Sequence, residues 1–379
     1  MSKSSTAQKT GYIIRLVAIN IVILILILVV IEGLSSYVLL VRDITTHSLA
    51  ERRHTKYDPD LGWSNEPSLH IPNMYGPGIY LNTNSQGFRN SRDFDTVAPD
   101  GKYRIICSGD SFTLGFGVDD DHTWCQALTS FDPRLESVNM GQGGYGVDQA
   151  YLWYKRDGVK LEHHVQLLAI ITDDFRRMQS DSFLGYGKPV IDIENGMLLV
   201  KNVPAPRRAY KFSWLTSNTQ YVRRLREVEL LERVSRKIGS ATDDADPLSK
   251  RKRNEETRKI LRKIFEDLKR LNEECSSKLA LVYLPTLGEV VGSGPDEWIQ
   301  FVEAESRTLD IPFINVLGIF RSLPYENVGA MFIREGQVDY KDAGGHLNDQ
   351  GNEFVARVIY EALKKQPALS QALSLHRRN

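Results

Sequence analysis

The sequence predicts a three-layer α/β/α sandwich with a central parallel sheet, preceded by one N-terminal transmembrane helix. Five short apolar runs, each ending in polar residues or glycine, have the length and composition of buried strands. Helical patterns lie between several of these runs, and strands that alternate with helices are typical of a parallel sheet covered on both faces. A much longer apolar run lies near the N-terminus of the 379-residue chain.

The composition limits the classes of function. Lys plus Arg and Asp plus Glu both number 48, so the formally neutral chain gives no global reason to expect a nucleic-acid partner. The three cysteines are too few and too scattered for a disulfide framework or a metal site. No zinc-protease or nucleotide-binding motif occurs, so we expect neither a metal nor a cofactor.

The N-terminal apolar run predicts a membrane anchor at residues 12–42, after a short tail at residues 1–11. Roughly 20 apolar residues suffice to cross a bilayer. The run is longer than the apolar part of a signal peptide, about 7–15 residues, and no cleavage site follows it. Basic residues flank it on both sides, so charge gives no orientation. The short N-terminal side favours a single-pass protein whose remaining domain is extracytoplasmic.

Residues 43–100 form a polar juxtamembrane segment rich in Pro, Gly and Asn, and they contain several turn signals. We expect the Asn-Ser-Gln-Gly-Phe-Arg stretch at residues 84–89 to pack along the edge of the following domain. That domain is expected at residues 101–368, and residues 369–379 are expected to be a C-terminal tail.

The regular alternation of strands and helices is interrupted at residues 176–252, which predicts an inserted cap beside the site. A β-hairpin is expected around Asn195-Gly196, because this dipeptide favours a two-residue turn. The apolar residues between Leu225 and Ile238 recur at helical spacing.

The strands carry the candidate site at their ends. The five apolar runs lie at residues 103–112, 136–146, 165–175, 278–286 and 311–317, and residues 147–158 are predicted to form a helix. The first three runs end in Gly109-Asp110-Ser111, Gly143-Gly144 and Asp173-Asp174. In parallel sheets, ligands bind beyond the carboxyl ends of the strands, so these residues are expected to share one site.

Two residues have the chemistry of a nucleophile and its base. A serine needs a base to remove its proton, and that base needs a third group to orient it. Ser111 follows a buried strand, and His346 lies in a glycine-containing loop before an amphipathic helix. Asp342 lies four residues before His346 and is the predicted acceptor for the imidazole N–H.

Four segments together resemble the sequence blocks of the SGNH (GDSL) hydrolase superfamily, whose fold is flavodoxin-like. The resemblance covers roughly residues 58–365. The blocks are Gly109-Asp110-Ser111-Phe112-Thr113, Asn139-Met140-Gly141-Gln142-Gly143-Gly144-Tyr145, Thr172-Asp173-Asp174-Phe175 and Asp342 to His346. The resemblance implies a serine esterase in which the N–H groups of Ser111 and Gly144 bind the oxyanion.

Two departures from the family pattern concern this site. The family's third block has an asparagine that donates to the oxyanion, and this chain has Asp173 there. The loss of one such donor costs about 2.7–4 kcal/mol of transition-state stabilisation. Either Asp173 is protonated, another donor replaces it, or the enzyme is slow. The last block is one residue longer than usual, so Asp339 is an alternative acid for His346.

The expected substrates are O-acyl esters of small molecules, cell-surface glycans or lipids. A polysaccharide O-acyltransferase would use the same residues, because a sugar hydroxyl can replace water as the acyl acceptor. A binding or assembly protein with a degenerate site is the alternative from another class, and Asp173 is the reason to consider it. The joint presence of Ser111, Asp342 and His346 favours an enzyme.

Overall fold

The structure of the protein is a computed structural model, which describes residues 3–45, 53–183, 186–205, 227, 230–231, 234, 247–292 and 297–374. The chain divides into two compact units. The first contains the N-terminal helix, and the second comprises Ala50–Ala209 and Leu248–Asn379. The helical pattern expected between Leu225 and Ile238 lies largely outside the described residues.

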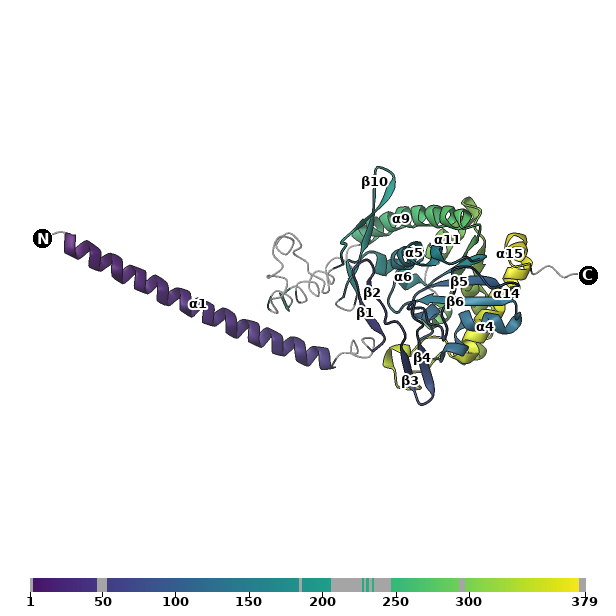
Figure 1. The fold of residues 1–379 in the computed structure, drawn as a ribbon, viewed down its shortest axis with the longest axis horizontal. Coiled ribbons are helices and arrows are strands. Elements are labelled where there is room, and N and C mark those ends of the chain that lie inside the picture. The colour runs from purple at the N-terminus through teal and green to yellow at the C-terminus, as the bar shows by residue number, and fades with distance from the viewer. Residues whose placement is uncertain are drawn as a thin grey trace, which may run out of the picture. The chain divides into compact units, whose positions relative to one another are not determined.

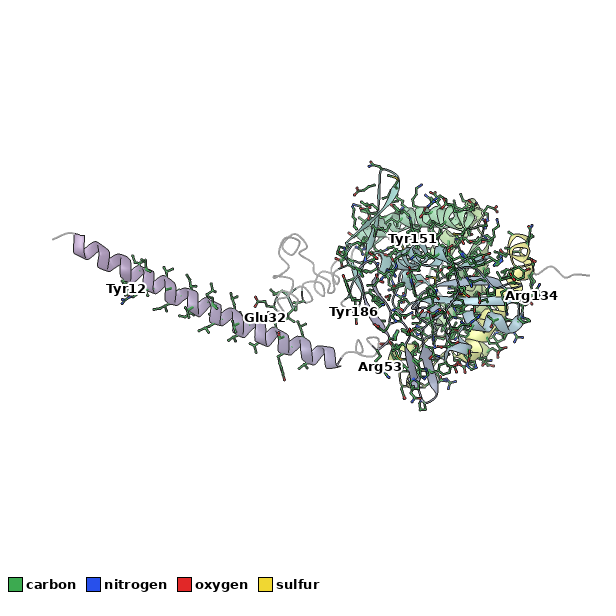
Figure 2. The ribbon with its side chains drawn as sticks, viewed as in Figure 1. Tyr12, Glu32, Arg53, Arg134, Tyr151 and Tyr186 are labelled. Atoms are coloured by element: carbon green, nitrogen blue, oxygen red, sulfur yellow. The ribbon has the colours of Figure 1, made fainter. Side chains whose placement is uncertain are left out.

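The first unit contains α1, a helix of 43 residues from Lys3 to Thr45. Its Gly11–Leu39 stretch has a mean hydropathy of 3.2 and is long and apolar enough to cross a membrane. The apolar side chains of this stretch are largely exposed, and Figure 2 shows them projecting along α1 from Tyr12 to Glu32. The predicted helix is therefore present, and its insertion into a membrane stays a prediction.

The second unit is built on a five-stranded parallel sheet in the order β13-β12-β7-β5-β6 (Figure 1). The five predicted apolar runs all supply strands, so this prediction is confirmed. The strands are β5 (Tyr103–Gly109), β6 (Leu135–Gly141), β7 (Val165–Ile170), β12 (Lys278–Tyr283) and β13 (Phe313–Asn315).

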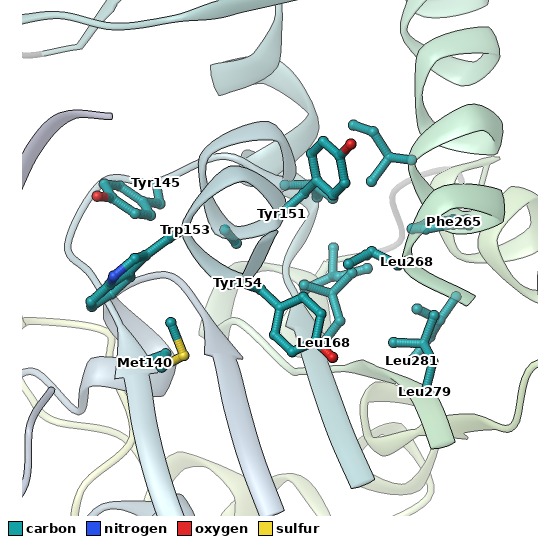
Figure 3. Close-up of a cluster of buried hydrophobic side chains, with 14 of the residues drawn as sticks. Met140, Tyr145, Tyr151, Trp153, Tyr154, Leu168, Phe265, Leu268, Leu279 and Leu281 are labelled. Carbon is teal, nitrogen blue, oxygen red and sulfur yellow. The ribbon is translucent and has the colours of Figure 1, made fainter. Parts of the chain in front are cut away.

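Helices cover both faces of the sheet, because alternate strand side chains point to opposite sides. One face carries Ile106, Leu168 and Leu281, which pack against α5 (Val147–Arg156), α9 (Pro247–Glu274) and α11 (Glu297–Thr308), as seen in part in Figure 3. The other face packs against α4 (Trp124–Phe131), α12 (Val316–Arg321) and α14 (Asp349–Lys365). The predicted three-layer α/β/α class is confirmed.

The segment before the sheet folds into two hairpins and closes the sheet's edge. The hairpins pair β1 (Thr55–Asp58) with β2 (Gly62–Asn65) and β3 (His70–Gly76) with β4 (Ile79–Asn82). The Arg89 N–H donates to the Asn139 carbonyl at 3.0 Å, and Asn90 bonds Asn139 and Ser137 through its side chain. The expected packing of residues 84–89 along the domain edge is confirmed, since β6 is an edge strand.

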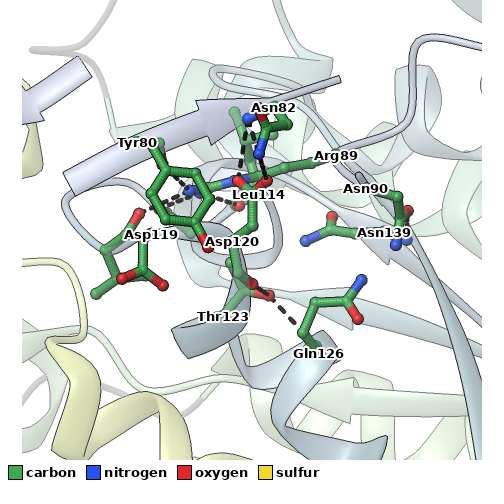
Figure 4. A network of polar contacts seen from close by, with 12 residues as sticks. Tyr80, Asn82, Arg89, Asn90, Leu114, Asp119, Asp120, Thr123, Gln126 and Asn139 are labelled. Carbon is green, nitrogen blue, oxygen red and sulfur yellow. Dashed lines mark hydrogen bonds and ion pairs between the residues drawn. The ribbon is translucent and has the colours of Figure 1, made fainter. Parts of the chain in front are cut away.

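A buried ion pair fastens the same segment to the loop after the nucleophile (Figure 4). Arg89 is fully buried, and its Nε donates to Asp120 Oδ1 at 2.8 Å. The guanidinium also donates to the carbonyls of Leu114, Gly115 and Val118. A buried charge is tolerated only when it is paired and hydrogen-bonded in this way. This segment therefore packs as part of the same compact unit as the sheet.

The inserted region begins with two described hairpins. These pair β8 (Ser182–Phe183) with β9 (Tyr186–Gly187), and β10 (Val190–Glu194) with β11 (Met197–Lys201). The hairpin predicted at Asn195-Gly196 is confirmed, and both residues have the positive φ that its turn requires.

The remaining helices among the described residues are short, and the last of them packs on the core. Helix α15 (Pro367–Ala372) overlaps the start of the expected C-terminal tail, and Leu369 and Leu373 are fully buried, so packing continues past residue 368. The others are α3 (Ser111–Leu114), α6 (Thr172–Met178), α10 (Leu287–Val291), α13 (Tyr325–Gly329), η1 (Asp120–His122), η2 (Gly158–Lys160) and η4 (Lys341–Ala343).

Candidate active site

The predicted nucleophile lies in the turn between β5 and α3. The Asp110 carboxylate caps α3 by accepting the Phe112 N–H at 2.8 Å, and Ser111 is the first residue of the helix. Gly109 is required here, because a Cβ atom would lie 2.4 Å from Thr113 Oγ1 and 2.8 Å from the Ala169 carbonyl oxygen. The tight turn leaves Ser111 only 4% exposed.

The structure brings His346 to this serine across 235 residues of sequence. His346 Nε2 lies 2.8 Å from Ser111 Oγ, a normal hydrogen-bond distance. The histidine backbone is fixed on both sides, since its N–H donates to the Ala343 carbonyl at 3.0 Å and its carbonyl accepts the Ile333 N–H at 2.8 Å. The two residues are therefore placed as a nucleophile and base require, while their catalytic roles stay predictions.

Aromatic rings hold the imidazole. The Phe112 ring stacks on His346 with centroids 4.4 Å apart and an interplanar angle of 29°. Phe116 lies on the same ring at 5.3 Å. Because Phe112 directly follows Ser111, the helix that presents the nucleophile also supports its base. The sequence argument for the histidine loop missed both phenylalanines.

Neither predicted acid bonds the imidazole. His346 Nδ1 has no hydrogen-bond partner among the described residues, so the expected bond from Asp342 is absent. Asp342 lies within η4, and the backbone groups of the next two residues, Ala343 and Gly344, raise the pKa of the ring instead. Asp339 lies beside the β3 hairpin, where its N–H donates to the Tyr75 carbonyl at 2.8 Å.

The environment keeps the imidazole neutral. Burial is the largest effect on His346 and lowers its pKa to about 4. Asp110 raises this pKa and Arg177 lowers it, so the two charges oppose each other. At neutral pH the ring is therefore uncharged and can accept a proton from Ser111.

Residues 142–145, which we call the oxyanion turn, follow β6 and contain the predicted oxyanion glycine. Gly144 has φ +76°, a conformation that favours glycine. The N–H groups of Ser111 and Gly144 donate to no described residue. A developing oxyanion requires donors of this kind, and the strands that lead into Ser111 and the oxyanion turn, β5 and β6, pair with each other.

Trp63, on β2, braces the oxyanion turn from the juxtamembrane segment. Its Nε1 donates to the Gly143 carbonyl at 2.9 Å, and the Tyr145 hydroxyl donates back to the Trp63 carbonyl at 2.5 Å. The indole is 4% exposed, so both bonds are sheltered from water. Sequence reasoning missed this contact, because 80 residues separate the bonded groups and no motif marks Trp63.

The two aspartates of the third block differ in exposure, since one side chain is buried and the other faces solvent. Asp174 is buried and caps α6 by accepting the Ile171 N–H at 3.0 Å. This inward cap leaves Asp173 with a side chain 46% exposed and in an ion pair with Arg176. Asp173 was expected at the position of the family's oxyanion asparagine, and the structure pairs it with a surface arginine instead.

Arg177 links the three strand-end segments. Its Nη1 donates to Asp110 Oδ2 at 2.9 Å, to Asp174 Oδ1 at 2.7 Å and to the Tyr145 carbonyl at 3.0 Å. Burial, followed by the nearby Asp110, raises the pKa of Asp174, and Arg177 opposes this rise. The signal that could have found this residue is its spacing, three positions after Asp174 on a helix.

The described residues contain no group of three or more His, Cys, Asp or Glu side chains that could hold a metal ion. The groups present are a buried serine in contact with a neutral histidine, and two backbone N–H groups that have no acceptor among the described residues. Such a set can carry out acyl transfer through a covalent intermediate.

Comparison with known proteins gives structural neighbours only. No family model matches the chain, and no curated protein matches it in sequence. The chain is similar to the crystal structure of a member of the lipolytic protein G-D-S-L family from Veillonella parvula, at 14% identity and a TM-score of 0.37, covering 70% of this chain and 100% of that one.

Two further neighbours have similar scores. The acetyl xylan esterase AlAXEase is 16% identical with a TM-score of 0.38, covering 68% of this chain and 98% of its own. The lipase/acylhydrolase from Enterococcus faecalis is 12% identical with a TM-score of 0.36, covering 69% and 95%. Only the geometry of the site therefore supports a function for this chain.

Proposed function

We propose that this chain is a membrane-anchored serine ester hydrolase of the SGNH type. The observation that carries the proposal is the 2.8 Å contact between His346 Nε2 and Ser111 Oγ. The N–H groups of Ser111 and Gly144, which have no acceptor among the described residues, support it. A binding protein has no need for a neutral base in contact with a buried serine.

In the proposed reaction, Ser111 Oγ attacks the ester carbonyl carbon while His346 Nε2 takes the hydroxyl proton. The N–H groups of Ser111 and Gly144 donate to the oxyanion of the tetrahedral intermediate. Its collapse breaks the bond to the leaving alcohol, which receives the proton from His346. Water then attacks the acyl-serine with the same proton transfers, and this second step releases the acid and restores the serine.

The proposed substrates are O-acyl esters of small molecules, cell-surface glycans or lipids, with the catalytic unit outside the cytoplasm. Helix α1 supports anchoring through its length and apolarity. The exposed side chain of Lys201 gives a site for testing topology. A Lys201→Cys variant in a Cys275→Ser background should react with an impermeant maleimide on intact cells. Reaction only after lysis would contradict the extracytoplasmic placement.

Transfer to a sugar hydroxyl is the second candidate. Ser111 is 4% exposed, and restricted access of water to an acyl-enzyme favours transfer over hydrolysis. Partitioning between water and an added polyol acceptor distinguishes the two reactions. An O-acyltransferase yields mostly acylated polyol, whereas an esterase yields free acid.

The direct test is hydrolysis of p-nitrophenyl acetate by the purified full chain in detergent. Ser111→Ala and His346→Gln should each lower kcat by at least about 1,000-fold, since residues of a nucleophile–base pair act as a unit. Ser91→Ala, which changes an exposed serine, is the matched control and should retain activity. Equal activity in all four proteins would exclude the proposed site.

A further inference from the structure

The aromatic ring of Phe183, in β8 of the inserted region, packs directly on the oxyanion glycine. A Cβ atom built on Gly144 would lie 2.3 Å from Phe183 Cε1 and 2.6 Å from Cδ1. These distances mean that the edge of the ring touches the Gly144 α-carbon itself. No side chain separates the insertion from the turn that is proposed to bind the ester oxygen.

An arginine of the same site also contacts this ring. The Arg177 guanidinium carbon lies 5.3 Å from the Phe183 centroid, within cation–π range. Arg177 in turn bonds Asp110 at 2.9 Å, and Asp110 Oδ2 lies 3.4 Å from Ser111 Oγ. Phe183 thus contacts the oxyanion turn and an arginine one side chain removed from the nucleophile.

One ring contact and two bonds made by Lys188 of its hairpin hold Phe183 in place. The Trp63 indole stacks on it with centroids 6.1 Å apart and an interplanar angle of 24°. At the base of its hairpin, the Lys188 N–H donates to the Asp181 carbonyl at 2.9 Å, and the fully buried Lys188 ammonium pairs with Asp148. An aromatic ring fixed on several sides is a rigid boundary, because a close-packed site resists displacement.

From these contacts we infer that Phe183 sets the acyl specificity of the proposed esterase, restricting it to short acyl groups such as acetyl. The inference rests on the proposed function. An ester oxygen bound to the Gly144 N–H brings its acyl carbon next to the surface that Phe183 covers. The 4% exposure of Ser111 leaves little other room for a long chain.

The test compares kcat/KM for p-nitrophenyl acetate, butyrate and octanoate in the full chain. The wild type should prefer acetate to octanoate by about 100-fold or more, since a pocket distinguishes single methylenes by about 10-fold or more. Phe183→Ala should raise the octanoate-to-acetate ratio by at least about 10-fold, with Phe183→Leu intermediate. Leu199→Ala truncates an exposed side chain on β11 of the same inserted region and should leave the ratio unchanged.

A wild type that prefers octanoate, or an unchanged ratio in Phe183→Ala, overturns the inference while leaving the proposed function intact. The rates at which methyl and octyl fluorophosphonates label Ser111 provide a readout that does not need turnover. The inference is supported if the methyl reagent labels the wild type faster than the octyl reagent and the two rates become equal in Phe183→Ala. If neither reagent labels Ser111, both the inference and the proposed function are overturned.

Discussion

Trp63 provides the sharpest test of how the juxtamembrane segment contributes to the site. Trp63→Phe removes the Nε1 donor that bonds the Gly143 carbonyl at 2.9 Å but keeps an aromatic ring in the same position. The carbonyl would then be buried without its partner, which costs about 1–3 kcal/mol. The turn can avoid this cost only by moving, and Gly144 would move with it.

The expected magnitude follows from that cost. If it falls on the transition state, 1–3 kcal/mol corresponds to a decrease in kcat of about 5- to 150-fold. KM should change little, because the oxyanion forms only after the substrate binds. The assay is steady-state hydrolysis of p-nitrophenyl acetate, with urea unfolding measured on the same preparations.

Trp298→Phe is the matched control for this experiment. Trp298 lies on α11, is 9% exposed and stacks on Phe175. Among the described residues it makes no hydrogen bond to the oxyanion turn. It therefore reports the loss of indole packing alone. The bond from Trp63 to the Gly143 carbonyl does not support catalysis if Trp63→Phe loses as much stability as Trp298→Phe but retains kcat within about twofold of wild type.

Three other predictions concern charge and protonation. The acid limb of kcat/KM should lie near pH 4, because the reaction needs neutral His346. Arg177→Gln should move this limb to higher pH, because Arg177 lowers the pKa of His346. Arg176→Gln, which removes the surface partner of Asp173, should leave the limb in place. Burial lowers the pKa of His54 to about 3, so the folded state resists protonation and loses stability as pH falls below 6.5. His54→Leu should remove about 2.5 kcal/mol of the loss in unfolding free energy measured between pH 7 and 4.5. Asp342→Asn should change kcat less than about threefold, because no bond to His346 is lost, and a larger decrease would restore Asp342 as the acid.

The strands, and the site residues Ser111 and Gly144 at their ends, could be predicted because their sequence signals are local. Buried parallel strands are continuous apolar runs, and residues at their carboxyl ends meet at one edge. This reasoning located all five strands and brought Ser111 and Gly144 to the same end of the sheet. The length of the apolar run likewise predicted helix α1.

The failures concern features that sequence spacing does not determine. Asp342 is close to His346 in sequence, but the η4 turn leaves Nδ1 without a carboxylate partner. Asp173 is turned outward because its neighbour Asp174 caps α6. Both outcomes depend on backbone turns of a few residues, where one additional residue changes the direction of a side chain.

The contributions of the juxtamembrane segment and the insertion could not be predicted for a different reason. The bond from Trp63 to Gly143 and the contact of Phe183 with Gly144 join segments that carry no common motif. Only tertiary packing brings them together, so a single sequence gives no local sign of either contact.

The activation of Ser111 by His346 can be measured by covalent labelling of the purified chain with a fluorophosphonate probe. We expect one labelled peptide containing Ser111, no labelling of Ser111→Ala, and strongly slowed labelling of His346→Gln. A folded wild-type protein that remains unlabelled, or one labelled at another serine, would contradict the assignment of Ser111 as the nucleophile.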